Sequence, residues 1–179
     1  MIRPNSWLGL LGGGQLGKMF AMKAQQMGYR VMIVDPSEHA PAKGVANLWL
    51  CAEYSDFSAL EKMVERCDAV TTEFENVPAQ SLGFLEKKLI VSPGKSAVEI
   101  IQDRILEKEF LRNNGFRTVP YTVLKNVQDL SRKEILEDFF PGFLKVSKFG
   151  YDGKGQVKVR DKLNLEASFK HLGQTPCVL

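Results

Sequence analysis

Three glycines and a lysine gather in the segment Gly-Tyr-Asp-Gly-Lys-Gly-Gln at 150–156. Glycines let a loop close on a ligand, with backbone amides near a bound anion. Lys145 lies just upstream in an extended stretch, where its ammonium group can meet phosphate oxygens as a compact charge. Asp152 lies among basic residues, so it should stay ionised and could orient a nucleophile or meet an amine. The segment predicts a loop that covers phosphate, with a plain Asp-Gly hairpin turn as the alternative.

The same loop lies in the most basic part of a chain whose net charge is only +3. Residues 143–162 contain six lysines and arginines against two aspartates. A local basic patch indicates a small anionic ligand or a phosphate backbone. A solvated basic face is the simpler interpretation, and only the glycine loop argues against it.

A second glycine-rich segment, Gly-Gly-Gly-Gln-Leu-Gly at 12–17, fits the pattern G-x-G-x-x-G between a strand and a helix. Asp35 ends the next predicted strand, 18 residues after Gly17. This pattern is typical of dinucleotide-binding folds. The same loop would also hold another phosphorylated small molecule, or it could merely form a tight turn. All three interpretations stay open at this point.

Two further groups of residues could contact a ligand. Glu73 and Glu75 follow a strand and would lie on the same side if the chain is extended there, which suits contacts to ribose hydroxyls or an amine. A solvated loop is the alternative. Arg104 borders the apolar positions Ile101 and Ile105 of a predicted helix, so it either extends to solvent along that face or contacts a nucleotide.

Apolar runs and helical periodicity in the first half predict strands that alternate with helices. Such alternation indicates an α/β fold with a doubly wound parallel sheet and right-handed crossovers. The predicted strands are 7–12, 30–35, 69–75 and 89–91, and the predicted helices are 15–27, 56–66 and 78–87.

The second half predicts a small α+β unit after a long helix. A capping box at Ser96 and Glu99, with Gly115 after the last turn, predicts one helix of about 17 residues. We therefore expect a first domain over 1–95, a connecting helix over 96–117 and a second domain over 118–179. The apolar end at 176–179 resembles a strand, so we expect the chain to be a piece of a longer protein. Further predicted strands are 142–148, 156–160 and 177–179, and further helices are 131–140 and 165–172.

Several classes of protein are excluded by composition. The three cysteines are scattered and odd in number, which suits a reducing cytosol better than a disulfide framework. The two histidines, His39 and His171, are too far apart in sequence to suggest a metal centre. The sequence has neither an 18-residue apolar run nor a secretory signal, so we expect a cytoplasmic protein without a membrane span.

Four motifs together resemble one family: LGGGQLGKM (11–19), TTEFENVP (71–78), QDRILEK (102–108) and LKVSKFGYDGKGQ (144–156). The chain is similar to the N-terminal half of the 5-(carboxyamino)imidazole ribonucleotide synthases, the ATPase subunits of phosphoribosylaminoimidazole carboxylase. These are ATP-grasp ligases of purine biosynthesis. The resemblance implies a Rossmann-like pre-ATP-grasp domain followed by an ATP-grasp lid subdomain.

The resemblance implies a reaction and its partners. ATP phosphorylates bicarbonate to carboxyphosphate, and the exocyclic amine of 5-aminoimidazole ribonucleotide is carboxylated, giving ADP and phosphate. Magnesium is expected, with ligands beyond residue 179 and none within 1–179. A homodimer is also implied, with no nucleic-acid or membrane partner. Residues 1–179 alone are expected to lack catalysis.

The resemblance also assigns residues by position in the motifs. The ATP-binding residues would be Arg104, Lys145, Gly150, Tyr151, Asp152, Gly153, Lys154, Gly155 and Gln156. Those facing bicarbonate and the reacting groups would be Tyr151, Asp152 and Lys154. The residues expected at the ribonucleotide substrate are Gly14, Gln15, Leu16, Glu73, Glu75 and Asn76.

Three other functions compete with this one. A different ATP-grasp ligase would share the loop at 150–156 but not the Glu-Phe-Glu-Asn segment at 73–76. An NAD-dependent oxidoreductase would use Gly12, Gly14, Gly17 and Asp35, but would leave the basic patch unexplained. The isolated chain could also be a nucleotide-binding module without catalytic activity.

Overall fold

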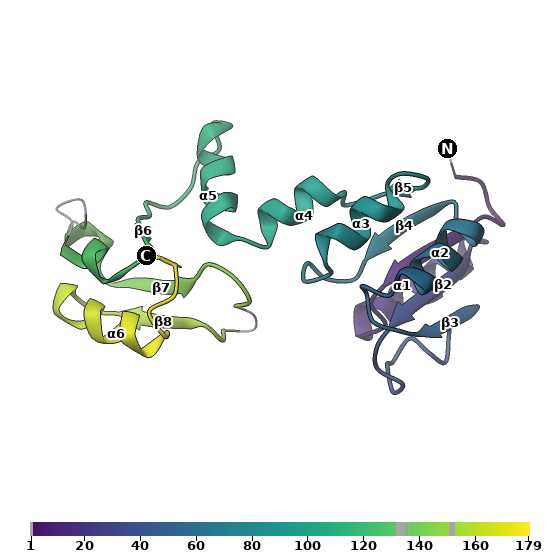
Figure 1. The fold of residues 1–179 in the computed structure, drawn as a ribbon, viewed down its shortest axis with the longest axis horizontal. Helices are drawn as coiled ribbons and strands as arrows, with labels where there is room; N and C mark the ends of the chain where they lie inside the picture. Colours follow the sequence, from purple (N-terminus) through teal and green to yellow (C-terminus); the bar gives the residue numbers. More distant parts are fainter. Residues whose placement is uncertain (1, 132–134, 136, 151–152) are drawn as a thin grey trace. The chain divides into compact units, whose positions relative to one another are not determined.

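The computed structural model describes residues 2–131, 135, 137–150 and 153–179. The chain divides into two compact units, Met1–Glu99 and Ile100–Leu179 (Figure 1). The division falls inside the region predicted to connect two domains. In the described part of the chain, no helix is long and apolar enough to cross a membrane.

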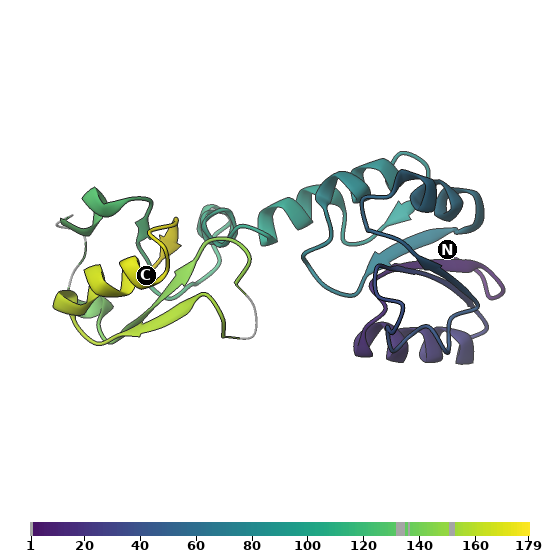
Figure 2. The same ribbon diagram turned by 60° about the horizontal axis from the view of Figure 1, so that its bottom comes forward.

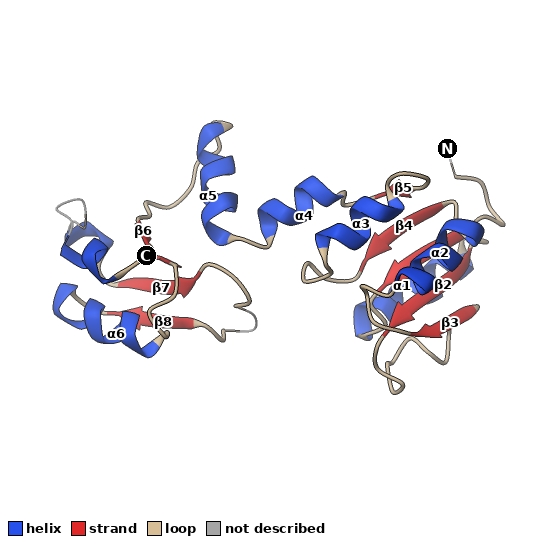
Figure 3. Ribbon diagram, in the orientation of Figure 1, coloured by secondary structure: helices blue, strands red, loops and turns tan. Residues whose placement is uncertain are grey.

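The first unit is built on a parallel sheet with the strand order β3-β2-β1-β4-β5 (Figure 3). In its centre, Leu10 pairs with Ile33 on one side and with Thr71 on the other. The predicted doubly wound parallel sheet is therefore confirmed. The edge strand β3 was not predicted, although Leu-Trp-Leu-Cys at 48–51 is a short apolar run; in the structure its residues are only partly buried or exposed. The strands are β1 (Trp7–Leu11), β2 (Arg30–Asp35), β3 (Leu48–Cys51), β4 (Ala69–Thr72) and β5 (Ile90–Val91).

Helices cover both faces of this sheet, with α1 (Gln15–Gln26) on one face and α2 (Phe57–Arg66) and α3 (Ala79–Leu85) on the other (Figure 2). Successive side chains of a strand point to opposite faces. In β2, Ile33 therefore packs in the cluster of α1, whereas Met32 packs in the cluster of α2 and α3. Burial on both faces explains why these strands read as continuous apolar runs.

The second unit is an antiparallel sheet with the order β6-β9-β7-β8, packed against α6 (Leu165–His171). Phe169 of α6 and Leu144 of β7 are fully buried in its core. This confirms the predicted α+β unit. The strands are β6 (Val123–Leu124), β7 (Gly142–Val146), β8 (Gln156–Val159) and β9 (Cys177–Val178), and three 3-10 helices are η1 (Val127–Ser131), η2 (Glu137–Phe139) and η3 (Lys162–Asn164).

The single long helix predicted after residue 95 is wrong. Two helices, α4 (Lys95–Ile101) and α5 (Arg104–Asn113), are separated at Asp103, which is extended with φ −122° and ψ 108°. Its carboxylate accepts a hydrogen bond from the Ile105 amide at 2.9 Å, so Asp103 begins a new helix as its N-cap. The helix α4 also starts at Lys95, before the predicted cap Ser96.

The helix predicted at 131–140 lies partly outside the described residues, at 132–134 and 136. Its described flanks belong to the 3-10 helices η1 and η2.

Candidate functional site

A small polar pocket of about 90 Å³ lies in the second unit between the start of α5, the strand β7 and the loop before β8. Every predicted ATP-binding residue that the structure describes lines it. Tyr151 and Asp152 lie outside the described residues, so their assignment stays a prediction. The lining residues are Arg104, Lys145, Val146, Gly150, Gly153, Lys154, Gly155 and Gln156.

The alternation of β7 places Lys145 in this pocket. Leu144 is fully buried toward α6, so its neighbour Lys145 points to the opposite face of the sheet. The Lys145 ammonium nitrogen lies 5.8 Å from the ring centre of Phe143, which lies on the same face. Lys145 also pairs in register with Gln156 of β8, so strand and loop are fixed to each other. The sheet thus holds a cation in place for a ligand.

The loop backbone closes back on β7. The Val146 amide donates a hydrogen bond to the Gly155 carbonyl at 2.9 Å. Gly155 has φ +69°, and a β-carbon there would lie 2.6 Å from Val146 Cγ2. Only glycine fits this position without strain, because other residues rarely adopt a left-handed backbone and have a β-carbon to accommodate. The glycines of the motif therefore keep the pocket open.

Arg104 enters the pocket from the first residue of α5. Its amide donates to the Ser147 carbonyl at 2.8 Å, which ties α5 to the end of β7. Its Nε is buried and has no hydrogen-bond partner among the described residues. A buried, unpaired donor on a cation is costly, and an anion in the pocket would satisfy it. This observation favours ligand contact over a side chain that merely extends to solvent.

A larger, more apolar pocket of about 420 Å³ shares Arg104 and Lys145 with the polar one. Its wall includes Tyr121 and Leu179, and the buried Tyr121 hydroxyl has no partner within the described part of the chain. A polar and an apolar pocket joined by two cations suit a molecule with a phosphate end and an aromatic end.

Sequence reasoning missed Lys108, which also lines this larger pocket. Helical spacing could have identified it, because Lys108 follows Arg104 by four residues and so lies on the same face of α5.

The first glycine loop is occupied by the protein's own carboxylates. The Gly13 amide donates to Asp35 Oδ2 at 2.7 Å, and the Gly14 amide donates to Glu73 Oε2 at 2.6 Å. These are amides that a pyrophosphate would need. The buried Asp35 also accepts from the Tyr54 hydroxyl at 2.8 Å, and burial together with this hydrogen bond raises the pKa of Tyr54 above its usual range. The Asp35 carboxylate is therefore already hydrogen-bonded within the protein, which argues against dinucleotide binding.

The predicted substrate residues follow two neighbouring strands, β1 and β4. The strand order reverses between these strands, and ligands of open α/β sheets bind at that point, beyond the carboxyl ends. Glu73 is half-buried against the glycine loop, whereas Leu16 at the start of α1 is 65% exposed. The six predicted residues lie in the segments that follow these two strands, and their assignment stays a prediction: Gly14, Gln15, Leu16, Glu73, Glu75 and Asn76.

A metal site was not predicted for this chain. Across residues 2–131, 135, 137–150 and 153–179, no group of three or more histidine, cysteine, aspartate or glutamate side chains could hold a metal ion.

Comparison with known proteins gives a family and several close relatives. The model of the ribonucleotide synthetase preATP-grasp domain matches residues 6–102. An N5-carboxyaminoimidazole ribonucleotide synthase of Staphylococcus aureus (strain COL) is 42% identical over 171 residues, which cover 96% of this chain and 46% of that protein. The chain thus spans about half the length of the curated relatives it matches.

Solved structures agree with these relatives. The N5-carboxyaminoimidazole synthetase from Staphylococcus aureus complexed with ADP matches with a TM-score of 0.90 and 40% identity, over 99% of this chain and 47% of that one. The carboxyaminoimidazole ribonucleotide synthase from Aspergillus clavatus complexed with ATP matches with a TM-score of 0.79 and 25% identity, over 97% of this chain and 46% of that one.

Proposed function

The chain belongs to the ribonucleotide synthetase preATP-grasp family, and from this membership we propose that it forms part of an ATP-grasp ligase. The reaction is the carboxylation of 5-aminoimidazole ribonucleotide by bicarbonate, with ATP converted to ADP and phosphate. The observation that carries the proposal is the polar pocket of Arg104, Lys145 and the loop at 150–156. The structures of the Staphylococcus aureus and Aspergillus clavatus relatives contain ADP and ATP, respectively.

The pocket has the chemistry that phosphoryl transfer needs. Such transfer depends on positioning and on neutralising charge, so fixed cations and backbone amides do most of the work. Lys145 and Arg104 supply the cations, and the unpaired Nε of Arg104 is a donor for a phosphate oxygen. The adjoining pocket beside Tyr121 accepts the base. In this proposal Lys154, with Tyr151 and Asp152, faces bicarbonate and the substrate amine.

The edge of the first sheet takes the ribonucleotide in this proposal. Glu73, whose carboxylate accepts from the Gly14 amide, lies with the exposed start of α1 at the carboxyl ends of β1 and β4. A carboxylate suits the ribose hydroxyls or the aminoimidazole better than it suits phosphate. Magnesium is part of the proposed reaction, and we expect its ligands beyond residue 179. We also propose that the full-length protein is a cytoplasmic homodimer that binds no nucleic acid.

The test is an assay of ADP release by the full-length protein with bicarbonate, with and without 5-aminoimidazole ribonucleotide. We expect ADP release together with loss of the free amine of the ribonucleotide. Absence of ADP release under both conditions would refute the proposal. Release that needs a different amine or carboxylate would instead indicate another ATP-grasp ligase.

A further inference from the structure

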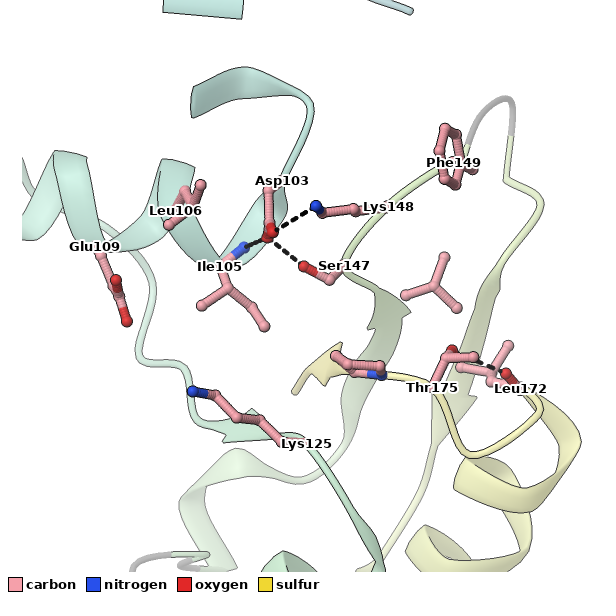
Figure 4. Close-up of a pocket in the computed structure, with 12 residues that line it drawn as sticks. Asp103, Ile105, Leu106, Glu109, Lys125, Ser147, Lys148, Phe149, Leu172 and Thr175 are labelled. Atoms are coloured by element: carbon pink, nitrogen blue, oxygen red, sulfur yellow. Dashed lines mark hydrogen bonds and ion pairs between the residues drawn. The ribbon is translucent and has the colours of Figure 1, made fainter. Parts of the chain in front are cut away.

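Asp103 connects the two chain segments that carry Arg104 and Lys145, although it does not line the polar pocket itself. Its carboxylate accepts hydrogen bonds from the Ser147 hydroxyl and from the Ile105 amide, and it lies 3.5 Å from the Lys148 ammonium. Figure 4 shows these three groups converging on Asp103 at the wall of a separate pocket of about 700 Å³. One carboxylate thus connects the start of α5 to the residues that follow β7, 44 positions later.

This contact joins Asp103 and Ser147, and each of them is close in sequence to a proposed ATP ligand. Arg104 directly follows Asp103, and its amide donates to the Ser147 carbonyl at 2.8 Å. Lys145 lies in β7, two residues before Ser147. A shift of α5 against β7 would therefore change the separation of the two cations at the pocket.

The carboxylate is held in its charged form. Burial works against ionisation, but the hydrogen bonds from Ser147 and from the backbone at 105–106, together with the Lys148 ammonium, hold the pKa of Asp103 below its usual range. A charged acceptor makes stronger hydrogen bonds than a neutral one. The Asp103 side chain is only 16% exposed, so these contacts are largely shielded from solvent.

We propose that Asp103 is a positioning residue of the nucleotide site, which holds the Arg104 guanidinium beside Lys145 by anchoring α5 to Ser147 and Lys148. This inference rests on the proposed ATP site. Precise placement of ligand-binding groups by supporting residues is a general requirement of such sites. A plain helix cap is the competing role, and it predicts a loss of stability without a change in affinity.

The test measures binding of a non-hydrolysable ATP analogue to the full-length protein by calorimetry, beside the melting temperature. Asp103→Ala is expected to weaken binding about tenfold, on the scale of a hydrogen bond to a charged group. Asp103→Asn keeps the oxygen that accepts from Ser147 and Ile105, and asparagine caps helices as well as aspartate does. It should therefore restore affinity to within about threefold of the unchanged protein.

Asp56→Ala is the matched control, because Asp56 caps α2 of the first unit through the amides of Ser58 and Ala59. It should lower the melting temperature and leave affinity unchanged.

Unchanged affinity in Asp103→Ala would overturn the inference. If Asp103→Ala does not fold, Ser147→Ala provides the test, because it removes the Ser147 hydrogen bond and leaves the cap on Ile105 intact. Unchanged affinity in Ser147→Ala would also overturn the inference. An unchanged protein that fails to bind the analogue would refute the ATP site itself.

Discussion

Replacement of Lys145 by alanine is expected to weaken ATP binding by the full-length protein about 100-fold, the scale of removing one partner of a desolvated charge pair. The side chain comes from a strand that is paired on both sides, with Gln156 on β8 and Val178 on β9. The sheet therefore fixes the backbone from which the Lys145 side chain reaches the pocket. Calorimetry with a non-hydrolysable ATP analogue measures the effect.

Lys158→Ala is the control for this change. Lys158 contributes the same charge to the basic patch, but it lines neither the polar pocket nor the apolar one that shares its cations. It is exposed, and exposed charges contribute little once salt screens them. Its loss should change affinity less than about threefold. Equal losses in both variants would mean that the patch attracts ATP only by its net charge.

Replacement of Gly12 by alanine is expected to lower the free energy of unfolding of the first unit by about 3 kcal/mol. Gly12 has φ +115°, and a β-carbon there would lie 2.6 Å from the β-carbon of Glu73. A β-carbon cannot rotate away, so the backbone at the end of β1 or β4 would have to move. Urea unfolding followed by tryptophan fluorescence measures this, because both tryptophans of the chain, Trp7 and Trp49, belong to the first unit.

Gly44→Ala provides the comparison for that measurement. A β-carbon at Gly44 would meet nothing within 4 Å, and its φ is outside the left-handed region. The substitution should change stability by no more than about 0.5 kcal/mol. If Gly12→Ala proved as harmless as Gly44→Ala, the close packing of Glu73 against the glycine loop would be wrong.

The sequence predicted the parts of the fold that depend on local pattern. Apolar runs such as 30–35 predicted central strands because these strands are buried on both faces. The stretch 142–148 was likewise predicted to be a strand, and β7 (Gly142–Val146) lies within it. The motif at 144–156 predicted a phosphate pocket, and its residues Lys145, Val146, Gly150 and 153–156 line one pocket together with Arg104.

The features that could not be predicted depend on contacts distant in sequence. The break at Asp103 is stabilised by Ser147 and Lys148, which no local helix pattern includes. The glycine loop at 12–17 matched a dinucleotide motif, yet two of its amides are paired with Asp35 at the end of β2 and with Glu73 just after β4. Only the three-dimensional arrangement identifies the partner of such a loop.

We propose that the loop at 150–156, and not the loop at 12–17, binds the ATP phosphates. Hydrogen–deuterium exchange of the full-length protein, with and without a non-hydrolysable ATP analogue, distinguishes the two loops. We expect the analogue to slow exchange in peptides that contain 150–156 and to leave those that contain 12–17 unchanged. Protection at 12–17 with none at 150–156 would contradict it.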